Sequence, residues 1–162
     1  MENCVVTDWD CSTPTKKGNS MVIKNSEMNN FVIRLGFWVE GANILIENCK
    51  INNWDYLLYI PDYALQYPIT LDHNTFTTKG CKGMVYFYHR SKNLNLDAKK
   101  EPLIIKNNTL NLGDSDYIVF GLGEKTMDKI KLIFEKNTVN PTTVLPVNPQ
   151  ARQAPNVTIV EN

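Results

Sequence analysis

Residues 44–51 read Ile-Leu-Ile-Glu-Asn-Cys-Lys-Ile, and the last six of them form a pattern that recurs along the chain. This pattern, called the frame below, runs apolar, any residue, polar, small or amide, any residue, apolar. Frames begin at residues 1, 23, 46, 71, 105, 134 and 159, and the last frame is cut short by the end of the sequence. Self-similarity at a spacing of roughly 20–50 residues indicates a repeat architecture.

The spacing of the frames favours short strands over helices. A turn of about 22–25 residues has room for about three strands of four or five residues joined by bends, given a rise of about 3.3 Å per residue. Stacked turns would bury their apolar faces against their neighbours, as in a solenoid, and connections of this type are right-handed. We therefore predict an all-β, right-handed parallel β-helix of about six coils. It forms one domain over residues 1–162, with irregular excursions at 90–101 and 141–155.

Each frame contains a bend. Its first and sixth positions are both apolar, yet they would face opposite sides of a flat strand because side chains alternate. Asn tolerates the left-handed conformation that such a corner needs. It occupies the third position in four frames, as Asn3, Asn25, Asn48 and Asn107.

The fourth position of the frame predicts an inward column of small and amide side chains. Its members are Cys4, Ser26, Cys49, Asn74, Asn108, Asn137 and Asn162. Stacked amides can pass hydrogen bonds from layer to layer, so Asn74, Asn108 and Asn137 are expected to form a structural ladder. The alternative is that these asparagines only mark solvated turns.

A second echo supports the same period. Trp9-Asp10 follows the first frame, and Trp54-Asp55 follows the frame at residue 46 at the same distance. The offset of 45 residues equals the first two frame steps together, 22 and 23. The two Trp-Asp pairs are therefore expected at the same corner, two coils apart.

Three segments carry a family resemblance: ANILIENCKINN at 42–53, PLIIKNNTLNL at 102–112 and KLIFEKNTV at 131–139. They resemble the coils of the right-handed parallel β-helix, or pectin-lyase-like, superfamily. More narrowly, they are similar to modules of secreted bacterial polysaccharide-utilisation proteins, including chondroitinase-B-like relatives. The resemblance implies a secreted or cell-surface protein, a polysaccharide or glycan partner, and a binding groove along one exposed strand ladder.

Candidate substrate-binding residues lie on the strands that would line such a groove: Arg34, Tyr59, Tyr86, Tyr88 and Tyr117. Tyrosines stacked from coil to coil would form an aromatic strip suited to sugar rings, with Arg34 and Arg90 engaging acidic groups. Two alternatives stay open. Tyr86 and Tyr88 could exchange orientation with Val85 and Phe87, or the tyrosines could be ordinary strand-favouring aromatics.

Catalysis is a weaker prediction. His89, Arg90 and Lys92 form the densest set of catalytic residue types. A polysaccharide lyase acting on uronic acids would need a base such as His89 and a cation to neutralise the substrate carboxylate. A calcium-binding Asp cluster of the pectate-lyase kind is absent from the sequence. The leading hypothesis is a carbohydrate-binding module, with the lyase and a structural spacer of the tailspike type as alternatives.

Composition narrows the remaining possibilities. Lys and Arg number 17, as do Asp and Glu, so the net charge is zero and gives no support for nucleic-acid binding. No apolar run approaches the length of a membrane span. The four cysteines suggest neither a disulfide framework nor a zinc site, and we predict no metal or cofactor. Because Met1 fills an apolar frame position, we expect a fragment of a longer solenoid, or a first coil that stacks on another coil or a second copy.

Overall fold

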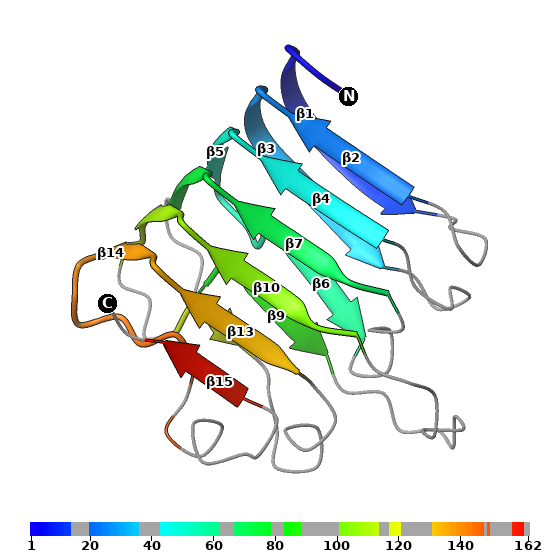
Figure 1. The fold of residues 1–162 in the computed structure, drawn as a ribbon. Helices are drawn as coiled ribbons and strands as arrows, with labels where there is room; N and C mark the ends of the chain where they lie inside the picture. The colour runs from blue at the N-terminus through cyan, green and yellow to red at the C-terminus, as the bar shows by residue number, and fades with distance from the viewer. Residues whose placement is uncertain are drawn as a thin grey trace.

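The computed structural model describes residues 1–13, 20–35, 43–61, 67–78, 83–88, 101–113, 117–120, 131–147, 149 and 157–160. In these ranges the regular elements are β-strands, and neighbouring strands pair in parallel. The strands stack in successive turns along one axis (Figure 1). The predicted all-β parallel β-helix is therefore confirmed.

One face of the solenoid is a sheet of six strands in the order β15-β13-β10-β7-β4-β2, seen as a row of parallel arrows in Figure 1. The strands are β2 (Ser20–Lys24), β4 (Asn43–Glu47), β7 (Ile69–Asp72), β10 (Leu103–Lys106), β13 (Leu132–Glu135) and β15 (Val157–Val160). The register pairs Ile23, Ile46, Leu71, Ile105, Phe134 and Ile159 in one column. These are the first positions of successive frames, so the sequence period sets the register.

The other two sides belong to a second sheet. Its strands are β1 (Val5–Thr13), β3 (Glu27–Leu35), β5 (Lys50–Asn53), β6 (Leu58–Pro61), β8 (Thr75–Thr78), β9 (Val85–Tyr88), β11 (Thr109–Asn111), β12 (Val119–Phe120) and β14 (Thr138–Asn140). Strand β3 serves both sides, because Met28 pairs with β5 and Ile33 pairs with β6. Between them Asn30 adopts a φ of 53°, a left-handed conformation that bends the strand.

The number of coils differs from the prediction. About three turns have a separate described strand on all three sides, namely β4-β5-β6, β7-β8-β9 and β10-β11-β12. The prediction of about six coils was too high because a frame predicts only the strands that flank its own corner, and does not show that the third side of the turn is also a separate strand. The six-stranded sheet also includes turns that have fewer separate strands on the other sides among the described residues.

The core consists of columns of apolar side chains that point into the solenoid. The sixth frame positions Met28, Ile51, Phe76 and Leu110 are almost fully buried and pair in one column. A third column on the remaining side contains Ile33, Leu58, Val85 and Val119. Residues 141–147, which belong to one predicted excursion, contribute Val144 and Val147 to the same core. Burial of an aliphatic or aromatic side chain contributes about 1.5–3 kcal/mol, so these columns are the main source of stability.

The corner of the frame has the predicted left-handed conformation. Third-position residues Asn3, Asn25, Asn48, His73, Asn107 and Lys136 all have φ between 50° and 55°. The four asparagines were predicted there, whereas His73 and Lys136 show that the corner is imposed by the fold even where the residue is not Asn.

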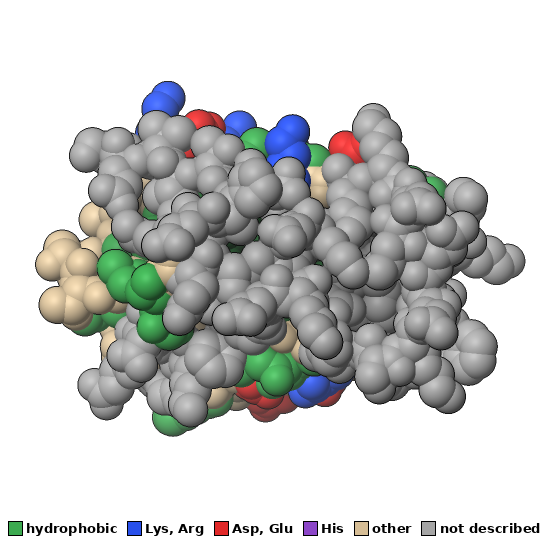
Figure 2. Space-filling model, turned by 90° about the horizontal axis from the view of Figure 1, so that it is seen from below, with side chains coloured by type: hydrophobic (Ala, Val, Ile, Leu, Met, Phe, Trp, Pro, Cys, Tyr) green, Lys and Arg blue, Asp and Glu red, His purple; other side chains and the backbone are tan. Residues whose placement is uncertain are grey.

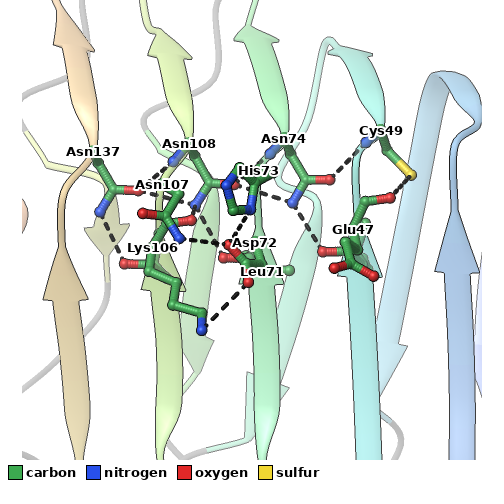
Figure 3. Close-up of polar contacts among 12 residues, drawn as sticks. Glu47, Cys49, Leu71, Asp72, His73, Asn74, Lys106, Asn107, Asn108 and Asn137 are labelled. Atoms are coloured by element: carbon green, nitrogen blue, oxygen red, sulfur yellow. Dashed lines mark hydrogen bonds and ion pairs between the residues drawn. The ribbon is translucent and has the colours of Figure 1, made fainter.

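The fourth frame positions form the inward ladder (Figure 3). Asn108 Oδ1 accepts hydrogen bonds from the Asn74 amide N–H at 2.8 Å and from Asn74 Nδ2 at 3.1 Å. Asn137 Oδ1 accepts the equivalent bonds from Asn108, both at 2.9 Å. Each amide nitrogen also donates to a carbonyl of the preceding turn, as Asn74 Nδ2 does to Ile46 O at 2.9 Å. The ladder therefore satisfies backbone groups that the corner would leave unpaired.

Smaller side chains continue the column toward the N-terminus. The Cys49 N–H donates to Asn74 Oδ1 at 2.9 Å, while its thiol lies 3.2 Å from Glu47 O. Burial raises the pKa of the Cys49 thiol, which favours the protonated form that can donate. The Ser26 hydroxyl accepts from the Cys4 N–H at 3.2 Å and donates to Lys24 O at 2.7 Å. Cys and Ser therefore preserve the bonding of the corner with less volume.

The outer surface of the six-stranded sheet bears charges of both signs in neighbouring turns. Lys24 Nζ lies 2.7 Å from Glu47, and Lys106 Nζ lies 3.3 Å from Asp72. In a view from below, described acidic and basic side chains occur together at two margins of the molecule (Figure 2). In this column Glu47 and Asp72 are neighbours of like charge, and each of them has a lysine partner on its other side.

The N-terminal end of the stack exposes apolar side chains. Met1, Val5, Trp9 and Val22 are between 43% and 75% exposed. Met1, Trp9 and Val22 line a shallow pocket there together with Phe31. The predicted stacking of this end on further coils or on a second copy stays a prediction.

Candidate functional site

The candidate site lies on the outer face of the side formed by the second half of β3, β6 and β9. Along β9, Val85 and Phe87 are buried while Tyr86 and Tyr88 are partly exposed. This settles the orientation that the sequence left open. Register places Arg34, Tyr59 and Tyr86 in one outward column, one turn apart.

Three tyrosine rings meet in this column. The Tyr59 and Tyr86 ring centroids are 5.6 Å apart in an edge-to-face arrangement. Tyr56, at the corner before β6, stacks on Tyr86 at 5.1 Å and meets Tyr59 edge-on at 5.4 Å. Such contacts are worth about 0.5–1.5 kcal/mol each beyond burial and hold the rings in fixed orientations. The guanidinium of Arg34 lies 4.2 Å from the Tyr59 ring centroid, a cation–π distance.

Arg34 is held between two carboxylates. Its Nε lies 3.0 and 2.8 Å from the two oxygens of Asp10, on the preceding turn. Its Nη2 lies 3.8 Å from Asp55, on the following turn. The hydrogen bond to Asp10 raises the pKa of Arg34, so the guanidinium stays charged. We call Arg34, Tyr56, Tyr59, Tyr86, Asp10 and Asp55 the Tyr–Arg cluster.

Tyr59 is fixed at both ends of its side chain. Its hydroxyl donates to Asp55 Oδ1 while its ring lies under Arg34. Burial raises the pKa of Tyr59, and the hydrogen bond to Asp55 and the charge of Asp55 raise it further. The hydroxyl therefore remains protonated at neutral pH and serves as a hydrogen-bond donor, not as a base.

Sequence reasoning missed Tyr56, Asp10 and Asp55 as members of the cluster. The signal for the two acids was present in the Trp-Asp echo, which placed Asp10 and Asp55 two coils apart. It did not say that Arg34, from the coil between them, would reach both.

The remaining predicted residues lie near the cluster or outside the described ranges. Tyr88 lies on the same outer face, paired with Pro61. Tyr117 lies one turn beyond β9, where it pairs with Leu145. His89, Arg90 and Lys92 fall outside the residues that the structure describes, so the predicted catalytic group has no geometry to assess.

Gly83 permits close approach of the turns beside the cluster. A Cβ at this position would lie 2.6 Å from Tyr117 O and 2.8 Å from Ile118 O. Only glycine can occupy such a position without a shift of the neighbouring backbone. The close approach brings β9 and its tyrosines under the turn that contains Tyr117.

The described part of the chain contains no group of three or more His, Cys, Asp or Glu side chains placed to hold a metal ion. No helix within that part is long and apolar enough to cross a membrane.

Comparison with protein-family models, with curated proteins and with solved structures finds no match. The fold assignment therefore depends on the geometry of this chain alone. The resemblance to the pectin-lyase-like superfamily remains a hypothesis beyond the parallel β-helix itself.

Proposed function

We propose that this chain is a carbohydrate-binding module, built on a parallel β-helix of the pectin-lyase-like kind and working in a secreted or cell-surface protein. The observation that supports it is the Tyr–Arg cluster. It places three tyrosine rings with fixed orientations on one partly exposed face, beside carboxylate and hydroxyl groups. Sugar rings present apolar C–H faces and polar edges, and tyrosine offers an apolar face and a polar tip in the same way.

The geometry also suits an extended polymer. Residues of the cluster come from consecutive turns about 4.8 Å apart, the usual spacing of paired strands. Contacts from several turns therefore follow the solenoid axis, and a glycan chain lying along that axis would meet them in sequence. Fixed side chains lose little conformational freedom on binding, which lowers the entropic cost of association.

The experiment is a glycan-array screen followed by calorimetry on the best ligand. Tyr59→Leu and Tyr86→Leu should each weaken binding at least tenfold, which corresponds to about 1.4 kcal/mol. Tyr67→Leu, a partly exposed tyrosine before β7, is the matched control and should bind as the unmodified protein does. Equal losses in all three variants, or no glycan bound at all, would refute the proposal.

An assembly or spacer role is the second candidate. Its support is the exposed apolar end around Met1, Val5, Trp9 and Val22. Sedimentation analysis tests it: a defined oligomer that Trp9→Ser dissociates, in a protein that binds no glycan, would favour this role over carbohydrate binding.

A further inference from the structure

We infer that the Tyr–Arg cluster selects uncharged glycans and disfavours uronic acids. The inference depends on the proposed carbohydrate-binding function and concerns the substrate class of the same site. It departs from the prediction that Arg34 would engage acidic groups of the ligand.

The first step is that the guanidinium of Arg34 already has acidic partners within the protein. Both oxygens of Asp10 lie within 3.0 Å of its Nε, and Asp55 lies 3.8 Å from its Nη2. The face of the guanidinium is also occupied, because Tyr59 lies beneath it. A uronate carboxylate that approaches the Nη groups of Arg34 would compete with two carboxylates that the protein supplies from its own chain, which have an effective concentration advantage.

The second step is the sign of the local charge. Two carboxylates and one guanidinium leave one net negative charge in the cluster. The ligand's carboxylate would therefore meet repulsion, whereas the hydroxyls of a neutral sugar can donate hydrogen bonds to Asp10 and Asp55. Both acids keep about half of their side-chain surface exposed, 55% and 46%, so they are accessible to a ligand.

The test uses pairs of glycans that share a backbone and differ at C6 in whether the group is a charged carboxylate. One pair is methyl-esterified and de-esterified homogalacturonan, and a second is cello-oligosaccharides and their C6-oxidised, glucuronic acid forms. Binding is measured by calorimetry at 20 and 300 mM NaCl. We expect at least about tenfold weaker binding of the carboxylated member of the pair that binds. Added salt should strengthen that weaker binding, because it screens repulsion.

Two variants identify the residue responsible. Asp10→Asn frees Arg34 from its nearest partner, so the preference should move toward the carboxylated polymer, and salt should then weaken that binding. Asp8→Asn is the matched control: it removes the same charge two residues away, from a carboxylate that accepts a hydrogen bond from Asn30 at 2.8 Å and does not contact Arg34. It should keep the preference of the unmodified protein.

Three results would overturn the inference. If the unmodified protein binds the carboxylated polymer equally well or better, the site does not disfavour acids, although carbohydrate binding itself stands. If Asp8→Asn shifts the preference as much as Asp10→Asn does, overall charge and not Arg34 sets the specificity. Absence of binding to all four polymers and to a wider neutral glycan panel would remove the proposed function together with this inference.

Discussion

Replacing Asn108 by Ala tests whether the inward ladder holds the turns together. Asn108 is 2% exposed, and its side chain forms hydrogen bonds to the turns on both sides of its own. Its Oδ1 accepts from the Asn74 amide N–H at 2.8 Å, and its Nδ2 lies 3.0 Å from Leu71 O and 2.8 Å from Lys106 O. Truncation would leave at least the Asn74 N–H and the Leu71 carbonyl without these partners.

The expected loss follows from those two groups. A buried donor or acceptor left unsatisfied costs about 1–3 kcal/mol, so Asn108→Ala should lower the free energy of unfolding by about 2–6 kcal/mol. This is a large share of the roughly 5–15 kcal/mol that stabilises a typical domain. Asn111→Ala is the matched control, because Asn111 accepts only an exposed hydrogen bond from Asn140, at 3.0 Å. It should cost at most about 0.5 kcal/mol.

The assay is urea unfolding followed by circular dichroism. Both variants are fitted with the same dependence of the unfolding free energy on urea concentration. If Asn108→Ala lowers the free energy of unfolding by no more than Asn111→Ala does, the ladder is not a major source of stability. Asn108→Asp adds a second check, because a buried carboxylate beside carbonyl oxygens has a raised pKa. The free energy of unfolding of Asn108→Asp should therefore approach that of the unmodified protein as the pH falls and the carboxyl becomes neutral.

Three further predictions concern other positions. Gly83→Ala should destabilise the protein by about 1–3 kcal/mol, since the new methyl group would meet two carbonyl oxygens; an unchanged melting temperature would show that β9 can shift freely. Lys136→Asn should stabilise it by up to about 1 kcal/mol, because Lys136 has a φ of 52° and Asn tolerates this conformation better; a lower urea midpoint would contradict this. Burial acts to raise the pKa of Asp72, but hydrogen bonds from Asn107 and Lys106 outweigh burial and hold that pKa below the ordinary value of 3.8. Asp72 should therefore add stability that is complete above about pH 5 and is lost as the pH falls through 3.8 and below. The gap in urea midpoint between the unmodified protein and Asp72→Asn should close over this range, and a constant gap would refute the assignment.

The fold was predictable because its signals are local and repeated. Each frame carries its own apolar pair and its own corner residue, so the register of one turn fixes the register of the next. The pairing of Ile46 with Leu71, and of Ile51 with Phe76, follows directly from the frame positions. The prediction was wrong on the number of coils, because the frame predicts the strands on either side of its corner and not a strand on the third side of the turn.

Features without a period were harder to foresee. Asn53 is buried and bonds to both the N–H and the carbonyl of Phe31, at 3.0 and 2.6 Å. It forms a second internal amide site, but no Asn recurs at that position in the next turn, where Thr78 pairs with it. The Tyr–Arg cluster was foreseen only in part, because side-chain directions across three turns cannot be read from spacing.

The contrast between two outer faces of the second sheet supports the proposal that the Tyr–Arg cluster is the binding site. On the side formed by β8, β11 and β14, the outward column is Thr75, Thr109 and Thr138, an ordinary strand-favouring choice. The neighbouring side carries Arg34, Tyr59 and Tyr86 at comparable outward positions. Exposed ion pairs contribute only about 0–1 kcal/mol, so the Asp10–Arg34 pair is not needed to hold the turns together. Because the core columns and the amide ladder already fix the register, the aromatic and charged residues on this side are not required for it, which supports the proposal that they bind a ligand.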